Sequence, residues 1–511
     1  MIRLSRALTG GVVNLREHLT MAAYLAIAGV AAVAAMSAFT QPAEALPSFA
    51  RQTGQPCGKC HTDFPALTPF GRRFKLLGYT IGGGEFRTTP FPSADDAKAA
   101  ADKMRSYAKS LDAGSEAGAD KGYVPPISLM TVVGFTHTQA SVPGQDPFKS
   151  NDNTVLAPFS AFWGGAITDN IGAFAQVTYT GPPAGGFSDP FGHTWTWDNT
   201  DVRYAKSLTL GKVDMVFGIT ANNNPTVQDV WNTTPAWSFP YAASTIAATP
   251  SAKTIIEGAF AAHVGGVGAY AFINDMLYLE ASVYKTLGFK QQNAVGVDPF
   301  GAPGLIDGFA PYWRAAFEPH WGDHSLMVGT FGMHTEIRPW IDTSFASFSM
   351  DTLGQTDKFT DAGFDAQYQY QGENYWFTLR GSYIREFQRL DATFGNGGAS
   401  NLNNDLNSLK LQGSLAYGGD HKVVVTGQYF DIWGSTDPFL YAANLGNGMS
   451  PNSNGFTAEI AYIPFGTSKA PGWPWFNARV GLQYTAYNKF DGTKTGASDH
   501  NSLFLHLWLA M

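Results

Sequence analysis

The feature that most constrains the fold is a repeated unit of two strand-like segments, a tight turn and a long polar loop, running from Ile127 to the C-terminus. Within the segments apolar residues alternate with polar ones, which is the period of a β-strand with two different faces. The tight turns have turn-forming composition and are Thr168–Asn170, Leu210–Lys212, Ile273–Asp275, Gly322–His324, Gly372–Asn374 and Gly418–Asp420, with a longer seventh at Gly466–Pro474. The long loops include Asn222–Pro250, Gly288–Asp307, Pro339–Lys358 and Ile432–Asn454. Short connections on one side and long ones on the other predict an outer-membrane β-barrel.

The segments number about sixteen, an even count in the range in which barrels have an open lumen. Their alternation predicts an apolar outward face on nearly every strand. In Tyr375–Glu386 the outward residues are Tyr375, Phe377, Leu379, Gly381 and Tyr383, and the inward ones are Trp376, Thr378, Arg380 and Ser382. The last segment places Leu503, Leu505, Leu507, Leu509 and Met511 outward and Phe504, His506 and Trp508 inward. A soluble β-sandwich or propeller is the competing fold, but it would not need these outward apolar faces.

Composition agrees with a barrel. Charged residues make up 14% of the chain, well below the quarter that is usual in soluble proteins, whereas aromatic residues reach 14%. Beyond the N-terminus no apolar run approaches the ~18 residues that a membrane-spanning helix needs. The net charge of −8 argues against a nucleic-acid partner. We interpret the inward charges Glu280, Arg314, Glu318, Asp365 and Arg380 as lumen lining, with an ion path as the alternative.

The N-terminus predicts export. Arg3, Arg6 and Arg16 precede an Ala-rich apolar stretch, and Ala43-Glu44-Ala45 fits the small-x-small cleavage pattern of a signal peptide. We therefore expect residues 1–45 to be a signal peptide, with an uncleaved anchor helix as the alternative. An exported protein with only two cysteines has no disulfide scaffold to explain them.

Those two cysteines belong to the motif Cys57-Gly58-Lys59-Cys60-His61, the C-x-x-C-H attachment signature of c-type haem. Two thiols at this spacing can reach the two vinyl groups on one porphyrin edge, and the histidine then becomes an axial ligand of the iron. A zinc site would need four ligands, and no second pair of ligands lies nearby. A thioredoxin-like redox pair would need a βαβ context, which is missing. We expect one covalently bound haem c, held by Cys57, Cys60 and His61.

The second axial ligand is predicted from strand alternation. In Ile127–Gln139, Leu129, Thr131, Val133 and Phe135 share the bulky face, so Met130 points into the barrel, where a haem-bearing domain would lie. A methionine ligand would raise the haem potential. We therefore expect Met130 as the second ligand, with Met104, His506 or an open position as alternatives.

Several segments share a pattern with a known family: Leu46–Gly54, the haem motif, Phe64–Arg72, Phe74-Lys75 and Gly78-Tyr79-Thr80, and the barrel segments Pro126–Met130, Phe135–Thr138 and Gly381–Glu386. With them the chain resembles the fused monohaem cytochrome–porin family, which includes outer-membrane iron oxidases of iron-oxidising bacteria. The resemblance implies oxidation of extracellular Fe(II), a one-electron Fe(II) oxidase activity, with electrons passed to a periplasmic cytochrome c or copper protein.

Together these features predict an all-β chain in the outer membrane of a Gram-negative bacterium. Its parts are a signal peptide (1–45), a small helical or irregular monohaem cytochrome c domain (46–94) that plugs the periplasmic side, an Ala-rich helix or linker (95–125), and a porin-like barrel of about sixteen strands (126–511). The alternatives are a diffusion porin whose haem gates or senses, and a conduit to another extracellular donor or acceptor, including electron flow outward to minerals. No hydrolytic motif is present, so no catalytic residue is assigned.

Overall fold

The structure is a computed structural model that describes residues 47–81, 98–99, 102, 104, 126–141, 149–179, 193–234, 238–342, 349–350, 354–418, 422–441, 449–466 and 472–511. One antiparallel sheet dominates these residues. Three of its nineteen strands are short, and the other sixteen form the wall of a closed barrel in the described part of the chain. The prediction of about sixteen strands is thus confirmed.

The wall follows the order of the sequence, each strand pairing with the next, and it closes where β21 pairs with β3, for example at Leu505 and Phe135. Its strands are β3 (Ile127–Thr138), β4 (Asn153–Ala166), β5 (Ile171–Tyr179), β6 (Trp195–Leu210), β7 (Val213–Asn222), β8 (Val264–Ile273), β9 (Leu277–Thr286), β11 (Ala310–Phe317), β13 (His324–Asp342), β15 (Asp357–Gln371), β16 (Tyr375–Leu390), β17 (Asn403–Tyr417), β18 (Val423–Gly434), β19 (Ser453–Tyr462), β20 (Asn477–Lys489) and β21 (Ser502–Ala510). The short strands are β10 (Gly304–Ile306), β12 (His320–Trp321) and β14 (Ser349–Met350). Short helices lie in the connections: α6 (Phe289–Ala294), η4 (Pro299–Gly301), α7 (Asp391–Gly395) and η5 (Ala497–His500).

The outer surface of this wall is apolar. Along β15 and β16 burial alternates as predicted, so that Phe364 and Leu379 are exposed while Asp365 and Arg380 are buried. The same pattern exposes large apolar side chains around the ring, among them Val133, Val177, Ile219, Val267, Leu279, Trp313, Val328, Leu411, Val425, Ile460 and Leu482. A closed barrel that is apolar outside and polar inside satisfies its backbone without an edge and suits a lipid bilayer. The chain is an outer-membrane β-barrel.

No helix in the described residues has the length and the apolar character needed to cross a bilayer.

The tight turns at 168–170, 210–212, 273–275, 322–324 and 372–374 lie between consecutive strands, as predicted. Residues 419–420 of the turn predicted at 418–420 and residues 467–471 of the seventh lie outside the described residues. Several strands are longer than predicted: β16 continues past Glu386 to Leu390, and β13 enters the loop predicted at 339–358. The strands are longer because their backbone pairing continues beyond the predicted ends. Asp357, the first residue of β15, pairs with Ile337 of β13 on one side and with Leu390 of β16 on the other.

The loop predicted at Asn222–Pro250 is longer than expected and runs from 223 to 263. It folds into the barrel. We call residues 223–234 and 238–263 the inner loop. Buried side chains such as Trp231, Phe239 and Phe260 pack along it. Its bonds to inward residues of the wall are Asp229–Arg314 (β11), Ile256–Asp361 (β15), Ile255–Glu386 (β16), Glu257–Lys410 (β17), Phe239–Gln428 (β18), Ala242–Gln483 (β20) and Ser244–Thr136 (β3). These contacts cross the lumen from one wall to the other.

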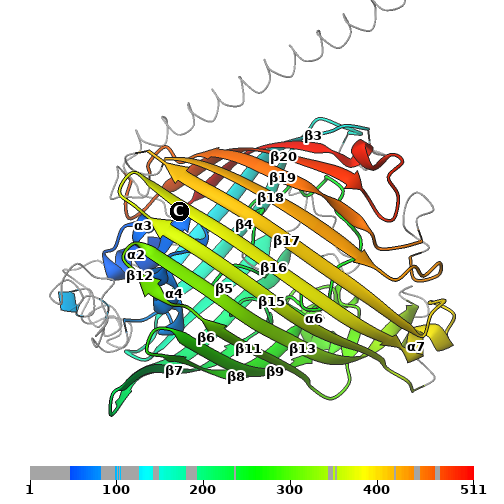
Figure 1. Cartoon of the computed structure of the whole chain (residues 1–511), viewed down its shortest axis with the longest axis horizontal. Helices are drawn as coiled ribbons and strands as arrows, with labels where there is room; N and C mark the ends of the chain where they lie inside the picture. The colour runs from blue at the N-terminus through cyan, green and yellow to red at the C-terminus, as the bar shows by residue number, and fades with distance from the viewer. Residues whose placement is uncertain are drawn as a thin grey trace, which may run out of the picture. The chain divides into compact units, whose positions relative to one another are not determined.

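The N-terminal segment 47–81, here called the plug segment, also lies within the barrel. It consists of α2 (Pro47–Thr53), α3 (Cys57–Cys60), a hairpin of β1 (His61–Asp63) and β2 (Ala66–Leu67), and α4 (Pro69–Leu76). Figure 1 shows these blue helices at the end of the barrel where the C-terminus and β12 lie, away from α7. Its anchors to the wall are Ser48–Ser128 (β3), Gln52–Gly164 (β4), Tyr79–Asp201 (β6), Tyr270–Leu76 (β8), Arg72–Gln369 (β15) and Arg479–Asp63 (β20).

The predicted signal peptide (1–45), and all of the predicted 95–125 linker apart from residues 98–99, 102 and 104, lie outside the described residues. Met104 is described: it is 3% exposed and packs in a cluster with Phe70, Phe74 and Leu77. The boundaries of the predicted cytochrome domain (46–94) stay a prediction.

Candidate functional site

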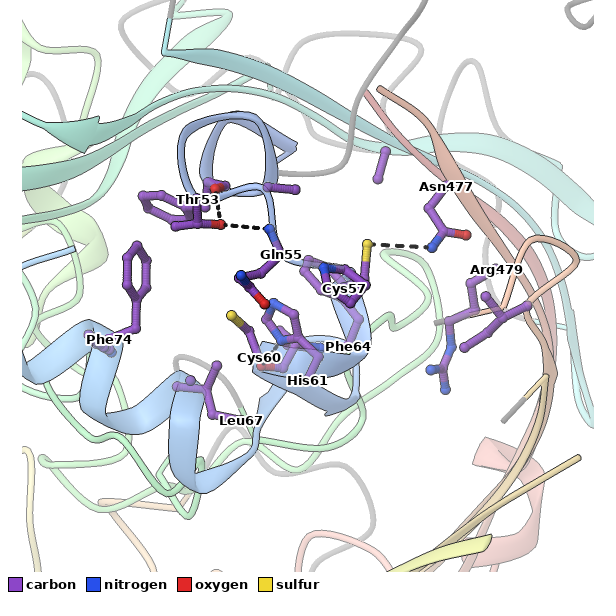
Figure 2. A pocket seen from close by; sticks show the side chains of 18 of the residues that line it. Thr53, Gln55, Cys57, Cys60, His61, Phe64, Leu67, Phe74, Asn477 and Arg479 are labelled. Carbon is purple, nitrogen blue, oxygen red and sulfur yellow. Dashed lines mark hydrogen bonds between the residues drawn. The ribbon is translucent and has the colours of Figure 1, made fainter. Parts of the chain in front are cut away.

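The haem motif folds as a single helical turn. Pro56, at φ −68°, precedes α3, and His61 ends it in extended conformation at φ −124°. Cys57 and Cys60 are three residues apart in this turn and therefore project from neighbouring positions on one side. No disulfide joins them. Figure 2 shows Cys57, Cys60 and His61 grouped beside Phe64, with Asn477 and Arg479 opposite them.

Helix α4 packs directly on this turn. Thr68 caps α4 by accepting a hydrogen bond from the Gly71 N–H at 3.1 Å, and its hydroxyl donates to the Lys59 carbonyl at 2.6 Å. A Cβ placed on Gly71 would lie 2.2 Å from the Cys60 carbonyl oxygen. Thr68 and Gly71 thus hold the motif against α4, the first by hydrogen bonds and the second by its lack of a side chain.

A cavity lies beside the motif. It holds about 1390 Å³ of empty space, part of it open to solvent. Apolar and aromatic side chains dominate its wall, from the plug segment (Phe49, Phe64, Leu67, Phe74, Tyr79) and from the barrel (Phe174, Ile463, Ala478, Trp508, Ala510). Cys57, Cys60 and His61 line it too. A large apolar cavity that meets two thiols and an imidazole suits a flat, mostly apolar cofactor.

The His61 ring is held in one tautomer. Its Nδ1 lies 3.1 Å from the Pro65 carbonyl oxygen, which can only accept, so Nδ1 carries the proton and Nε2 keeps its lone pair. Fixing one ring nitrogen by a backbone carbonyl is the usual way in which a protein orients a histidine metal ligand. Burial lowers the pKa of His61 to about 4, which keeps the imidazole neutral. His61 is therefore prepared to bind a metal through Nε2.

The Cys60 thiol is buried, and this burial, with a smaller contribution from Cys57, raises its pKa to about 12. The thiol therefore stays protonated near neutral pH.

An ion-pair network of buried groups joins the motif to the barrel. Arg479 of β20 lines the cavity and pairs with Asp63 of the plug segment and with Glu459 of β19. The inward His506 of β21 contacts the same Glu459, with His506 Nε2 3.2 Å from Oε2. Asn477 lies nearby, its Nδ2 4.0 Å from Cys57 Sγ. Arg479, Asp63 and Glu459 were not predicted from the sequence. The one signal for them in the sequence is the inward parity of Arg479 and Glu459 on their strands.

Met130 faces inward, as predicted, but it does not line the cavity. It packs against two clusters, one that contains Phe504 and Trp508 and one that contains Phe74 and Tyr79, against which Cys60 also packs. Met104 and His506 are also absent from the cavity lining in the described residues. The structure thus brings Cys57, Cys60 and His61 together at the cavity, and these three candidates do not line it.

The inward charges predicted as lumen lining are all buried. Four of them, Arg314, Glu318, Asp365 and Arg380, contact the plug segment or the inner loop, whereas Glu280 accepts hydrogen bonds from Tyr278 and Ser282 of its own strand. Glu318 binds Arg72 of the plug segment and accepts a hydrogen bond from the Trp231 indole at 2.9 Å. Arg314 pairs with Asp365 and lies 3.7 Å from Asp229 of the inner loop. At these positions the charges hold elements inside the barrel instead of facing an open channel.

No family profile and no curated protein matches the chain. Among solved structures it is similar to a loop-deletion mutant of OmpT, an outer membrane protein of Vibrio cholerae, at 9% identity and a TM-score of 0.39, over 76% of this chain and 99% of that one. It is also similar to OprB of Pseudomonas putida (12% identity, TM-score 0.44, 75% and 93% covered) and to the outer membrane channel DcaP of Acinetobacter baumannii (12%, 0.38, 78% and 99%).

Proposed function

We propose that this porin-like outer-membrane barrel carries one c-type haem, covalently bound through Cys57 and Cys60 with His61 as axial ligand, and transfers electrons between the cell surface and the periplasm. The observation that carries the proposal is a C-x-x-C-H turn whose thiols and imidazole line a large apolar cavity inside the barrel. Bound there, the haem would supply a one-electron iron couple.

The residues of the chain fit that group. His61 offers Nε2, because Nδ1–H is held by Pro65. Aromatic side chains from the plug segment and the wall, such as Phe49 and Trp508, offer flat apolar surfaces to the group. Arg479 is the buried cation at the cavity edge and could offset an anionic substituent.

We further propose extracellular Fe(II) as the donor substrate and a periplasmic cytochrome c or copper protein as the acceptor. Fe(III) is poorly soluble near neutral pH, so oxidising iron outside the cell keeps the precipitate there. The barrel supplies a passage through an insulating bilayer, and the plug segment lies at the end with the short turns, which face the periplasm in barrels of this type.

A diffusion porin with a gating or sensing haem domain is the second candidate, and the sixteen-stranded wall favours it, since barrels of this size form aqueous channels. The inner loop and the plug segment cross the lumen and bind its inward charges. This filling of the lumen supports electron transfer as the function.

The test is stopped-flow mixing of the purified, oxidised, full-length protein with Fe(II), after covalent haem has been measured as the alkaline pyridine haemochrome. We expect one haem per chain and its reduction by excess Fe(II). The Cys57→Ala/Cys60→Ala variant should have no covalent haem. Covalent haem that excess Fe(II) does not reduce would refute the iron-oxidase proposal and leave the haem in place.

A further inference from the structure

The lining of the cavity bears on how an iron atom held by His61 would be coordinated. A second strong axial ligand would be a methionine thioether, a second imidazole, an amine, a thiolate or a tyrosine phenolate. Of the described residues that line the cavity, none is a methionine, and His61 is the one histidine among them. Lys75 supplies the one lining amine in that part of the chain.

Lys75 is already engaged. Its side chain is buried, and its Nζ donates to the Val227 carbonyl and lies 3.4 Å from the Asp229 carbonyl oxygen, both in the inner loop. Below its pKa the ammonium group has no lone pair to offer a metal, and its N–H groups are directed at carbonyls of the inner loop. Lys75 therefore holds α4 to the inner loop.

Four polar side chains of the lining are also in use. Tyr79 donates its hydroxyl proton to Asp201 Oδ2 at 2.6 Å, and Asn232 Oδ1 accepts from the Leu67 N–H at 3.1 Å. Asn477 Nδ2 donates to the Gly466 carbonyl at 3.2 Å, and Thr53 donates to the Phe49 carbonyl at 2.7 Å. Each of these four groups is thus hydrogen-bonded to another group of the protein.

The predicted second ligand, Met130, and its alternatives Met104 and His506 do not line the cavity in the described residues. Phe64 and Trp508, whose rings lie 5.0 Å apart, form part of the cavity wall, and Met130 packs against the clusters that contain Trp508 and Phe74. Met104 is buried with Phe70 and Phe74. The Nε2 of His506 contacts Glu459.

We infer that the second axial position of the His61-held haem has no strong protein ligand, and that it binds small neutral π-acceptor ligands, for which carbon monoxide is the probe. This inference rests on the proposed function, because it needs the haem. Aromatic side chains (Phe49, Phe74, Tyr79, Phe174) enclose much of the cavity, and such an apolar site admits a neutral diatomic molecule more readily than an anion.

The test uses the full-length protein purified in detergent with its haem counted by the pyridine haemochrome. The ferric form should have the high-spin signal of an iron with one strong axial ligand. Adding carbon monoxide to the dithionite-reduced form should shift the Soret band and saturate at one ligand per haem. Met130→Leu and Met104→Leu are the matched controls, and both should keep the spin state and the carbon monoxide titration of the unmodified chain.

A low-spin ferric haem that does not react with carbon monoxide would overturn the inference. The variants would then identify the ligand: reactivity gained in Met130→Leu, Met104→Leu or Lys75→Leu marks the residue that had occupied the position. A chain with no covalent haem contradicts the proposed function itself, so the two failures are distinguishable.

Discussion

At the scale of single residues, the absence of a side chain at Gly71 lets α4 approach the haem motif. A Cβ at this position would lie 2.2 Å from the Cys60 carbonyl oxygen, a backbone atom that cannot rotate away. The helical backbone itself would accept alanine, so the penalty is steric and amounts to about 1–3 kcal/mol.

Gly71→Ala should therefore displace α4 from the motif. We expect amide hydrogen exchange in α4 to accelerate by about one to two orders of magnitude, and covalent haem per chain to fall. The control is Gly427→Ala in β18, where a Cβ would have nothing within 4 Å. If both variants exchange like the unmodified chain, α4 does not depend on this close contact.

The burial of Lys75 predicts that the stability of the plug segment depends on pH. Burial, assisted by the charge of Arg203, lowers its pKa to about 8 from the usual 10.5 of lysine. Between these two values the folded chain has released the proton while the unfolded chain still binds it, so the stability of the plug segment rises with pH in that window.

We expect the free energy of opening of α4, measured by hydrogen exchange with intrinsic rates corrected for pH, to increase from pH 8 to pH 10 by up to about 3 kcal/mol. The Lys75→Leu variant should lack this increase. If the free energy of opening of α4 rises equally with pH in the two proteins, Lys75 does not titrate as its burial implies.

At the scale of elements, Asp229 organises the inner loop. It accepts hydrogen bonds from the N–H groups of Trp231, Thr233 and Thr234 at 2.9, 2.8 and 3.0 Å, and it lies 3.7 Å from Arg314 of the wall. Removing a buried partner of this kind leaves unpaired donors and costs about 3–5 kcal/mol.

Asp229→Ala should therefore loosen the inner loop and raise the permeability of the barrel to small sugars in a liposome-swelling assay. The matched control is Asp307→Ala, which removes an exposed pair with Arg338 at 3.2 Å and should leave the swelling rate unchanged. An Asp229→Ala protein that swells at the control rate would mean that this carboxylate does not hold the loop in place.

At the scale of the whole molecule, the two candidate functions differ in what fills the lumen. We expect the complete protein to give liposomes little more solute permeability than empty ones. A variant that lacks both residues 47–81 and residues 226–260 should swell quickly, because β7 and β8 are antiparallel neighbours that a short hairpin can join. Equal, rapid swelling of both proteins would favour the diffusion porin.

The sequence by itself determined what depends on local repetition. Alternation at period two assigns each residue of a strand to a face, so the outward position of Leu379 and the inward position of Arg380 followed from β16 alone. The closed wall of sixteen strands followed from the number of such segments. The spacing of Cys57, Cys60 and His61 likewise places three groups in one turn wherever that turn lies. Each of these features is decided by neighbours along the chain.

Only the tertiary structure decided which inward residues meet. Alternation put Met130 inside the barrel, but it does not say how the plug segment sits there, and Phe64 and Trp508 lie at the cavity in its place. Arg479 and Asp63 are 416 residues apart, and the inner loop looked like any long polar loop. Such contacts depend on the register of the closed sheet and on how the plug segment and the inner loop share the lumen, and both bring together residues that no local pattern relates.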